Sequence, residues 1–377
     1  MTVDESTSKP VLLKPVKVGN LTLQHRVVLS PLTRLRATEK YHVPTPIMAE
    51  YYSQRGSTPG TLLITEGTFI AAKAGGLTNV PGVWSKEQIK GWKVVTDAVH
   101  AKGSFIFLQL LALGRAASID QLHTEDPLLA LVSSSDIPLS GAPAPRPLTL
   151  EEISEYIDLY ATAAENAVHQ AGFDGVEVHG ANGYLIDQFI QDVSNNRTDA
   201  YGGSVENRCR FALEVVDKVV KAVGAERTGI RLGPWTPFQD MGMEDPKPTF
   251  SYLVQQIKSL HPSFAYTHLI EPGVAGHADA EVRPSASNDF LRDIWSPKVL
   301  ITAGGYKPET AFARAARQPE NELIAFGRYF ISSPDLPIRL ANNIPLTPYD
   351  RSTFYLPGDV SGRGYTDYPF ASDQGKM

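Results

Sequence analysis

Three side chains that can exchange hydrogen bonds or protons follow one apolar stretch of this 377-residue chain. The segment GVEVHGANGYLIDQF (175–189) begins as a buried strand and then presents His179, Asn182 and Tyr184 within six residues. His179 and Asn182 lie three apart just past the strand, so they can donate two hydrogen bonds to one oxygen and stabilise charge that develops there. Tyr184, whose ordinary pKa is about 10, is protonated at neutral pH and can deliver a proton nearby. The alternatives are a core histidine and an aromatic cavity wall.

The composition is that of an ordinary soluble globular protein. With 42% hydrophobic residues, 20% charged residues and a formal net charge of −6, the chain lacks the basic surface that nucleic acid or an anionic membrane requires. No apolar run approaches the roughly 18 residues of a membrane-spanning helix. The polar start MTVDESTSKP has no apolar signal-peptide core. We therefore expect a cytoplasmic protein that binds neither nucleic acid nor membranes. Its oligomeric state does not follow from composition, and we expect a monomer or homodimer.

Cysteine and histidine usage argues against a metal centre. Cys209 is the only cysteine, so the chain can form no internal disulfide and can hold no thiolate-bound iron–sulfur cluster or structural zinc. It lies in a helical pattern, which favours an inert buried thiol. None of the nine histidines is two residues from another, as a metal-dependent barrel hydrolase would generally need. We expect no metal site.

Eight β-rich runs alternate with helical patterns along the chain. Near-continuous apolar runs of this kind are typical of parallel strands that are covered on both faces. Eightfold strand–helix alternation predicts a single-domain (β/α)₈ TIM barrel, with a doubly wound sheet as the alternative. We expect the barrel core over about 10–345 and a C-terminal extension over about 346–377. The eight runs are 27–32, 61–67, 104–111, 175–181, 228–234, 265–272, 298–305 and 322–330.

Helix starts and long loops add detail to this barrel. Ser85–Gln88 and Thr149–Glu152 read as capping boxes, and Gly172 as the end of the second helix. The connections 112–148 and 273–291 are longer than a barrel needs. Both follow strands, so we expect them over the C-terminal face as lids or binding loops.

The ends of the last two strand runs carry residues suited to a phosphate. Gly304 and Gly305 end the seventh run, and Gly327 and Arg328 lie at the end of the eighth. Barrels often cradle a phosphate at this place through backbone N–H groups. Glycine lets the backbone approach closely, and an arginine adds a charge-assisted contact.

Two further polar residues suit a redox-active heterocycle. Gln109 can donate to and accept from the edge of a ring that presents a carbonyl beside an N–H. Arg231 is a permanent cation that can stabilise a ring that becomes anionic on reduction. Phosphate and redox heterocycle together indicate flavin mononucleotide (FMN). No GxGxxG follows the first strand, so a Rossmann dinucleotide site is unsupported.

Several of these stretches together resemble the Old Yellow Enzyme family. The resemblance runs from about residue 10 to 370 in the family's order and spacing. Its most specific part is the combination of HGANGYLIDQF with YGGSVENR. The matching stretches are PLTRLRA (31–37), TLLITEG (61–67), HGANGYLIDQF (179–189), DAYGGSVENRCRF (199–211) and FGRYFISSPDLPIRL (326–340).

The resemblance implies a non-covalently bound FMN at the top of the barrel. In that family FMN is reduced by NADPH, with NADH possible here, and is reoxidised by an α,β-unsaturated carbonyl compound. His179 and Asn182 then hold the carbonyl oxygen of an enone or enal, and Tyr184 protonates Cα after hydride reaches Cβ. The positions that correspond to FMN contacts are Thr33, Gly67, Gln109, Arg231, Gly304, Gly305, Gly327 and Arg328.

The chain also departs from the family pattern. Leu111 stands where several yeast members carry a tryptophan, and Gly304-Gly305 replaces a common Gly-Asn pair. Phe238 and Tyr355, with its neighbour Phe354, resemble substrate-pocket residues. GRAAS (114–118) and the 326–340 stretch are similar to fungal members that act on an unsaturated aldehyde in alkaloid biosynthesis.

Other functions are compatible with parts of the pattern. An isomerase on the same scaffold would return the hydride to the product, but a proton donor such as Tyr184 traps the reduced product instead. A non-catalytic flavin-binding protein would not need Tyr184 beside His179 and Asn182. A Schiff-base aldolase needs a lysine near a strand end, and the strand runs contain only Lys298, at a start. We therefore predict an FMN-dependent NADPH dehydrogenase that reduces activated C=C bonds.

Overall fold

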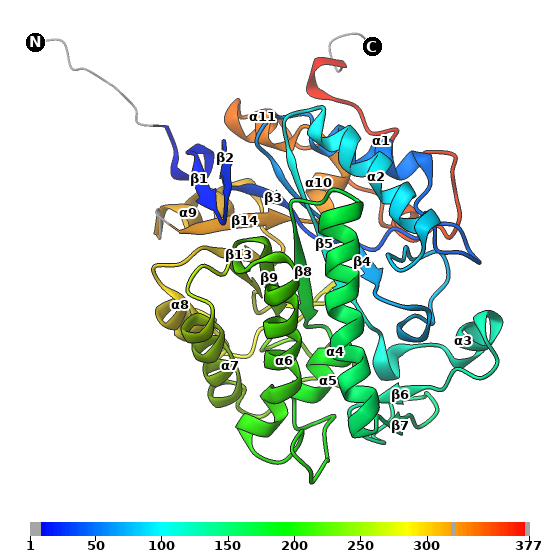
Figure 1. Ribbon diagram of the computed structural model, residues 1–377. Coiled ribbons are helices and arrows are strands. Elements are labelled where there is room, and N and C mark those ends of the chain that lie inside the picture. Colours follow the sequence, from blue (N-terminus) through cyan, green and yellow to red (C-terminus); the bar gives the residue numbers. More distant parts are fainter. Residues whose placement is uncertain (1–8, 318–320, 374–377) are drawn as a thin grey trace, which may run out of the picture.

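The computed structural model describes residues 9–317 and 321–373, and its centre is a closed barrel of eight parallel strands (Figure 1). Each of the eight predicted runs overlaps one barrel strand, which confirms the TIM-barrel prediction. The last strand pairs with the first, Ile324 lying opposite Val27, and so closes the barrel. In sequence order the strands are β3 (Val27–Leu29), β4 (Leu62–Phe69), β5 (Phe105–Leu111), β8 (Gly175–Gly180), β9 (Thr228–Leu232), β10 (Tyr266–Ile270), β13 (Leu300–Ala303) and β14 (Glu322–Phe326).

Helices surround this barrel, and both predicted capping boxes are present. Ser85 Oγ accepts from Gln88 N, and Thr149 Oγ1 accepts from Glu152 N. The second of these helices continues through one π turn and ends near Gly172, whose φ is +81°. The helices are α1 (Pro46–Arg55), α2 (Lys86–His100), α3 (Ile119–Glu125), α4 (Leu150–Glu165), α5 (Leu185–Ile190), α6 (Val205–Val223), α7 (Lys247–Leu260), α8 (Asp289–Trp295), α9 (Pro308–Arg317), α10 (Arg328–Ser332) and α11 (Leu336–Ala341).

Apolar side chains fill both the space between barrel and helices and the N-terminal end of the barrel interior. The outer layer includes Trp92 of α2, which is fully buried beside Phe173. At the N-terminal end, the hairpin of β1 (Val16–Val18) and β2 (Leu21–Leu23) packs on the starts of the strands. Burying each such side chain contributes about 1.5–3 kcal/mol. Cys209 is buried in α6 as predicted, and burial raises the pKa of its thiol to about 12.

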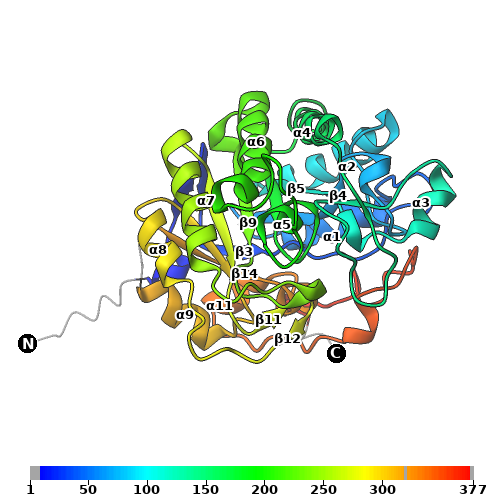
Figure 2. The ribbon, with the colours of Figure 1, turned by 90° about the horizontal axis from the view of Figure 1, so that it is seen from below.

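The two long connections behave differently. The 273–291 connection forms a hairpin of β11 (Val274–Ala275) and β12 (Ala278–Asp279) that borders a cavity, as expected. The 112–148 connection contains α3, β6 (Val132–Ser133) and β7 (Arg146–Pro147), and none of its residues lines that cavity. It packs on α5 instead, where Gln188 bonds to its backbone and to Ser133. Figure 2 looks onto the end of the molecule that carries α5 and the β11–β12 hairpin.

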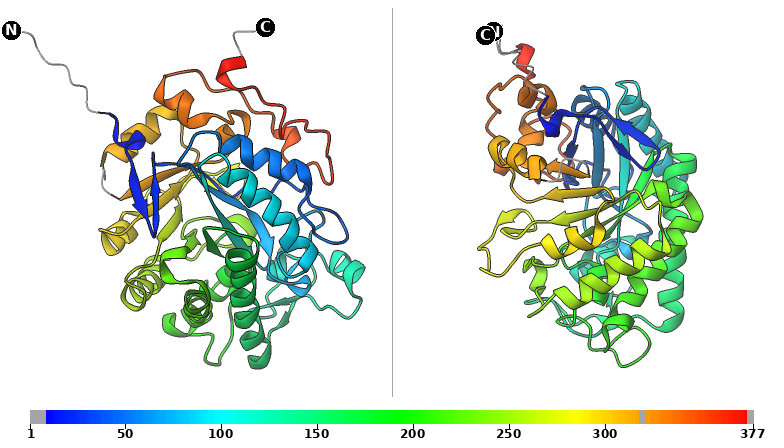
Figure 3. Two further views of the ribbon diagram at one scale, coloured as in Figure 1. Left: turned by 45° about the horizontal axis from the view of Figure 1, so that its top comes forward. Right: turned by 90° about the vertical axis from the view of Figure 1, so that its left-hand side faces the viewer.

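The C-terminal segment runs along the outside of the barrel near α1 and α11 (Figure 3). Buried arginines hold it through its backbone carbonyls: Arg34 donates to Gly364 O at 2.7 Å, and Arg55 to Tyr365 O at 2.9 Å. The predicted extension over about 346–377 is thus fixed to the barrel as far as residue 373, and 374–377 lie outside the described residues. The polar start over 1–8 also lies outside them. No helix in the described ranges could cross a membrane.

Candidate active site

All the residues predicted for the site lie around one cavity of about 900 Å³ at the C-terminal ends of the barrel strands. The residues come from the ends of β3, β4, β5, β8, β9, β13 and β14 and from the connections that follow them. The structure therefore brings together positions that are separated by more than 300 residues in the sequence. These residues are Thr33, Gly67, Gln109, Leu111, His179, Asn182, Tyr184, Arg231, Phe238, Gly304, Gly305, Gly327, Arg328 and Tyr355.

The end of β8 carries His179, and the sharp turn that follows carries Asn182 and Tyr184, so that all three border the cavity. Asn182 and Gly183 have φ values of +60° and +70°, in the left-handed region that glycine and asparagine tolerate best. The turn is held by Asp187, whose Oδ2 accepts from Gly183 N at 2.9 Å. Tyr184 is the residue before the first turn of α5, and its ring centroid lies 5.3 Å from that of His179.

Several buried polar atoms around this turn are left unpaired by the protein. Within residues 9–317 and 321–373, His179 Nδ1, Asn182 Oδ1 and Arg231 Nε have no hydrogen-bond partner. An unsatisfied buried polar group costs about 1–3 kcal/mol, so folding alone gives no reason to keep three of them together. The arrangement is that of a site built to bond a ligand.

Burial keeps His179 and Tyr184 uncharged. Burial lowers the pKa of His179 well below its usual value, and the charge of Arg231 lowers it further. The imidazole is therefore neutral and can donate through only one ring nitrogen. Burial also raises the pKa of Tyr184, although a hydrogen bond with Gln239 works against this shift. The phenol therefore holds its proton at neutral pH.

One wall of the cavity suits the polar edge of a heterocycle. Gln109 and Arg231 both border the cavity, and Gln109 Nε2 donates to Glu177 Oε1 at 2.8 Å. Gly67 lies at an irregularity of β4, and a Cβ there would be 2.6 Å from Leu111 Cδ2. Any larger residue at 67 would therefore press on Leu111 and fill space between it and Gln109.

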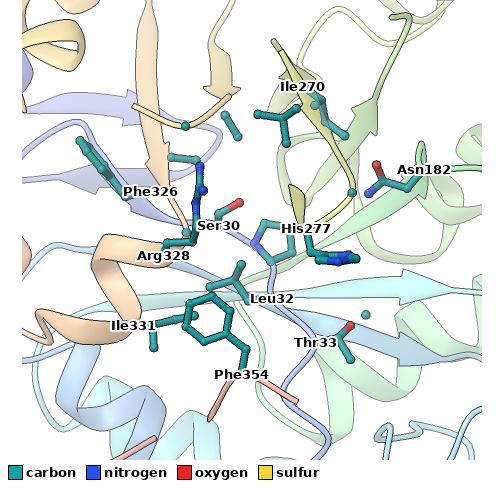
Figure 4. Close-up of a pocket in the computed structure, with 18 of the residues that line it drawn as sticks. Ser30, Leu32, Thr33, Asn182, Ile270, His277, Phe326, Arg328, Ile331 and Phe354 are labelled. Carbon is teal, nitrogen blue, oxygen red and sulfur yellow. The ribbon is translucent and has the colours of Figure 1, made fainter. Parts of the chain in front are cut away.

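The opposite side of the cavity suits a phosphate. Gly305 has a φ of +70°, and a Cβ there would lie 3.3 Å from Arg328 Nη2. The Arg328 guanidinium forms two hydrogen bonds to Asp279 of the β11–β12 hairpin, at 2.7 and 3.1 Å. In the view of Figure 4, Arg328 and Asn182 lie on opposite sides, with His277 between them.

The β11–β12 hairpin contributes two site residues that the sequence did not indicate. His277 lies at its tip, with ring centroids 6.0 Å from Phe238 and 5.8 Å from Tyr355, both nearly edge-on. Arg351 fixes the tip by donating to His277 O at 2.8 Å. Neither His277 nor Asp279 follows a strand directly, so no strand-end argument could have found them. They were missed because only the folded hairpin brings them to the cavity.

Glu177 was also missed, although the sequence carried a signal for it. It is fully buried on β8 between two valines, where an apolar residue would be expected. A charged residue in an otherwise apolar strand is buried only with partners. Those partners are Gln109 and His268.

The size and the lining of the cavity match what FMN requires. The cavity has room for a flavin nucleotide, its walls hold unpaired polar atoms, and glycines keep its backbone accessible at both the ring side and the phosphate side. A fixed cation, Arg328, lies beside the glycines. The residues fit the cofactor.

Comparison with known proteins decides the family. Residues 11–347 match the model of the NADH:flavin oxidoreductase / NADH oxidase family. This chain belongs to that family. The Old Yellow Enzyme resemblance is thereby confirmed, because the fold is also similar to that of the Old Yellow Enzyme from Pichia sp. AKU4542. That structure has a TM-score of 0.87 and 39% identity, over 96% of this chain and 94% of the other.

Relatives in this flavin oxidoreductase family include reductases of fungi. The chanoclavine-I aldehyde reductase of Penicillium roqueforti is 51% identical over 96% of this chain and 97% of its own length. A protein of Epichloe festucae var. lolii that is named a probable inactive reductase is 47% identical over 96% of each chain. This chain is an FMN-dependent oxidoreductase that takes its electrons from NAD(P)H. The roles of individual site residues, the oligomeric state and the cytoplasmic location stay predictions.

Proposed function

We propose that this enzyme reduces the activated C=C bond of α,β-unsaturated aldehydes and ketones, with NADPH as the preferred reductant. One observation carries the proposal. His179 and Asn182, which can each donate one hydrogen bond through a ring N–H or the amide NH₂, border a cavity that fits FMN, beside the protonated phenol of Tyr184. Such a set can hold an oxygen and supply a proton to the same small molecule.

The cofactor would be held at both ends of the cavity. Gln109 and Arg231 would bond the pyrimidine edge of the flavin, Thr33 and Gly67 would lie along its ring, and Arg328 would pair with its phosphate. Gly304, Gly305 and Gly327 would let backbone N–H groups approach that phosphate. FMN held there would supply the hydride chemistry for Cβ of the substrate, with electrons from NADPH.

His179 and Asn182 would orient the substrate and stabilise the charge that grows on its oxygen. Each donates one hydrogen bond to the carbonyl oxygen, which becomes enolate-like as the Cα=Cβ bond gains electrons at Cβ. The neutral state of His179 suits a donor that need not give up its proton. Preorganised donors of this kind contribute several kcal/mol to a transition state.

Tyr184 would complete the reduction. Its phenol gives a proton to Cα while hydride is added at Cβ, so the substrate gains two electrons and two hydrogens and leaves saturated. The phenol then regains a proton from solvent. The raised pKa of Tyr184 keeps the donor loaded at neutral pH.

The substrate class follows from the pocket wall and from the named relative. Leu111, Phe238, Tyr355 and His277 provide apolar and aromatic surface around the reacting end of the cavity. The similarity to a chanoclavine-I aldehyde reductase supports an unsaturated aldehyde as the physiological substrate class. An isomerase on the same scaffold is the alternative, and Tyr184 favours reduction because it traps the saturated product.

The proposal is tested by the chromophore and by the product. The purified protein should be yellow, release FMN on denaturation, and convert 2-cyclohexenone with NADPH to cyclohexanone in a one-to-one ratio. Release of FAD, or no flavin after reconstitution, would contradict the cofactor assignment. NADPH consumption without a saturated product, or an isomerised product without net NADPH consumption, would contradict the proposed reaction.

A further inference from the structure

The buried carboxylate of Glu177 lies under the cavity without bordering it. Its side chain is fully buried in the barrel interior, and its backbone pairs in register with Gln109 of β5 on one side and Gly229 of β9 on the other. Gly229 leaves room inside the barrel, since a Cβ there would lie 2.4 Å from the Tyr266 ring. Gln109 has a proposed contact with the flavin, whereas Glu177 has no role in the proposed reaction.

Glu177 joins residues from two other strands. Its Oε1 accepts from Gln109 Nε2 at 2.8 Å, and its Oε2 accepts from His268 Nδ1 at 2.8 Å. Both bonds are short and lie in the dry interior, where bonds to a charged acceptor are strongest. The carboxylate thus fixes Gln109 from the side away from the cavity.

The donors around Glu177 keep its carboxylate ionised. Burial by itself raises its pKa, but the neighbouring His268, with the Arg231 charge and the Gln109 bond, outweighs burial, so the pKa is lowered overall. An ionised carboxylate has acceptors and no donor. Everything that bonds to it must donate.

This chemistry decides which end of the Gln109 amide faces the cavity. The two ends of a glutamine amide have nearly the same shape, and only the bonding partners set which is which. Because an acceptor-only group meets one end, that end must be the NH₂. The carbonyl oxygen Oε1 is left for the cavity, where it lies 3.5 Å from a Cβ placed on Gly67. It is an acceptor, and the N–H in the pyrimidine edge of a flavin is the matching donor.

We propose that Glu177 is a positioning residue for the cofactor, which holds the Gln109 amide with its oxygen toward the flavin pyrimidine edge. The inference rests on the proposed FMN contacts of Gln109. It assigns Glu177 no contact with substrate or cofactor. Neutralising this carboxylate allows both ends of the Gln109 amide to face it, so part of the population presents NH₂ toward the flavin N–H.

The test is a double-mutant cycle on FMN affinity. Holoenzyme is diluted and the released FMN is measured by its fluorescence, for the wild type, Glu177→Gln, Gln109→Ala and the double variant. Glu177→Gln should weaken FMN binding about tenfold, the effect of losing one hydrogen bond that depends on a charged partner. In the Gln109→Ala background the same substitution should change the affinity less than twofold. Equal effects in both backgrounds would overturn the proposal.

A matched control separates positioning from stability. Glu322 is also a fully buried carboxylate on a barrel strand, but its partners Arg292 and Arg314 do not border the cavity, whereas Gln109 does. Glu322→Gln should lower the denaturation midpoint and leave the FMN affinity of the folded protein unchanged. An equal loss of FMN affinity in Glu322→Gln would show that any buried charge change weakens the site, which would also overturn the proposal.

Exchanging the residue types at positions 109 and 177 provides a second test if Glu177→Gln does not fold. Gln109→Glu alone places two carboxylates against each other and should release FMN. Adding Glu177→Gln restores a donor–acceptor pair, leaves an oxygen at position 109 toward the cavity, and should recover FMN binding at least tenfold. No recovery would contradict the positioning role. A wild type that binds no FMN would instead refute the proposed function.

Discussion

The two ends of the barrel each bury a histidine, and they treat it differently. At the N-terminal end, His25 precedes β3, its Nε2 donates to Thr61 Oγ1 at 3.0 Å, and its Nδ1 accepts from Val27 N at 3.2 Å. Thr61 in turn donates to Thr58 O. At the C-terminal end, His179 Nδ1 has no hydrogen-bond partner within residues 9–317 and 321–373.

This contrast shows that a lowered pKa does not by itself identify a functional histidine. Burial lowers the pKa of His25 to about 4, and burial also lowers that of His179. Both imidazoles are neutral for the same physical reason. What distinguishes them is hydrogen bonding: His25 has both ring nitrogens bonded to protein, whereas the ring of His179 has no hydrogen bond within residues 9–317 and 321–373 and borders the cavity.

The largest effect that this comparison predicts belongs to Tyr184. Tyr184→Phe should leave flavin reduction by NADPH nearly unchanged and slow reoxidation by 2-cyclohexenone roughly 10²–10⁴-fold, because only the second half-reaction needs a proton at Cα. Stopped-flow absorbance of the flavin measures each half-reaction. Wild-type reoxidation in Tyr184→Phe would make the tyrosine a cavity wall and favour the isomerase.

The next effect concerns the oxygen site directly. Phenols such as p-hydroxybenzaldehyde should bind the oxidised enzyme and change the flavin spectrum, with the phenolate oxygen between His179 and Asn182. Replacing both residues by alanine should weaken this binding at least 10²-fold, since two hydrogen bonds to a charged oxygen are lost. His25→Gln, at the other end of the barrel, should titrate like the wild type. If the double alanine variant also titrates like the wild type, the phenolate oxygen binds elsewhere.

A smaller effect is expected for the cofactor phosphate. Arg328→Ala should weaken FMN binding about 10- to 100-fold through loss of a charge-assisted contact. Arg314→Ala is the control, because Arg314 also pairs with a carboxylate, Glu322, but does not border the cavity. FMN fluorescence on dilution of each holoenzyme measures the difference, and equal affinities in the two variants would remove Arg328 from the phosphate site.

The smallest effect appears in the pH dependence of stability. The pKa of His25 is about 4 in the folded chain, below its unfolded value of about 6.5. As the pH falls, the imidazole is therefore protonated first in the unfolded state. The contribution of neutral His25 to the free energy of unfolding is complete above pH 6.5 and is lost as the pH falls toward 4. From pH 7 to 5 the wild type should lose about 2 kcal/mol more unfolding free energy than His25→Gln. Urea denaturation at both pH values measures this, and parallel losses would contradict it.

The residues at the centre of the proposed site are predictable from local sequence. His179, Asn182 and Tyr184 are predictable because one strand end and one tight turn hold all three, and the turn is encoded by Asn182 and Gly183 themselves. The eight strands were predictable for a similar reason. A run of apolar residues needs burial on both faces wherever it lies, so periodicity alone indicates it.

The long connections were less predictable because their packing partners are distant. The 112–148 connection was expected over the cavity, yet its polar groups are satisfied by Gln188 of α5, and it supports the segment that carries Tyr184. Nothing in a loop's own sequence specifies which surface will satisfy its backbone. The 273–291 connection met the expectation, although its two cavity residues, His277 and Asp279, gave no local signal.

Local sequence is enough to predict the barrel strands, the turn that carries His179, Asn182 and Tyr184, and Gly327 next to Arg328, because each depends on residues that are neighbours along the chain. The contacts of Glu177 with Gln109 and His268, and of Asp279 with Arg328, follow from the tertiary structure alone. Those contacts join residues from separate strands and loops. Their existence depends on how the barrel closes, which places strand ends side by side regardless of their distance in sequence.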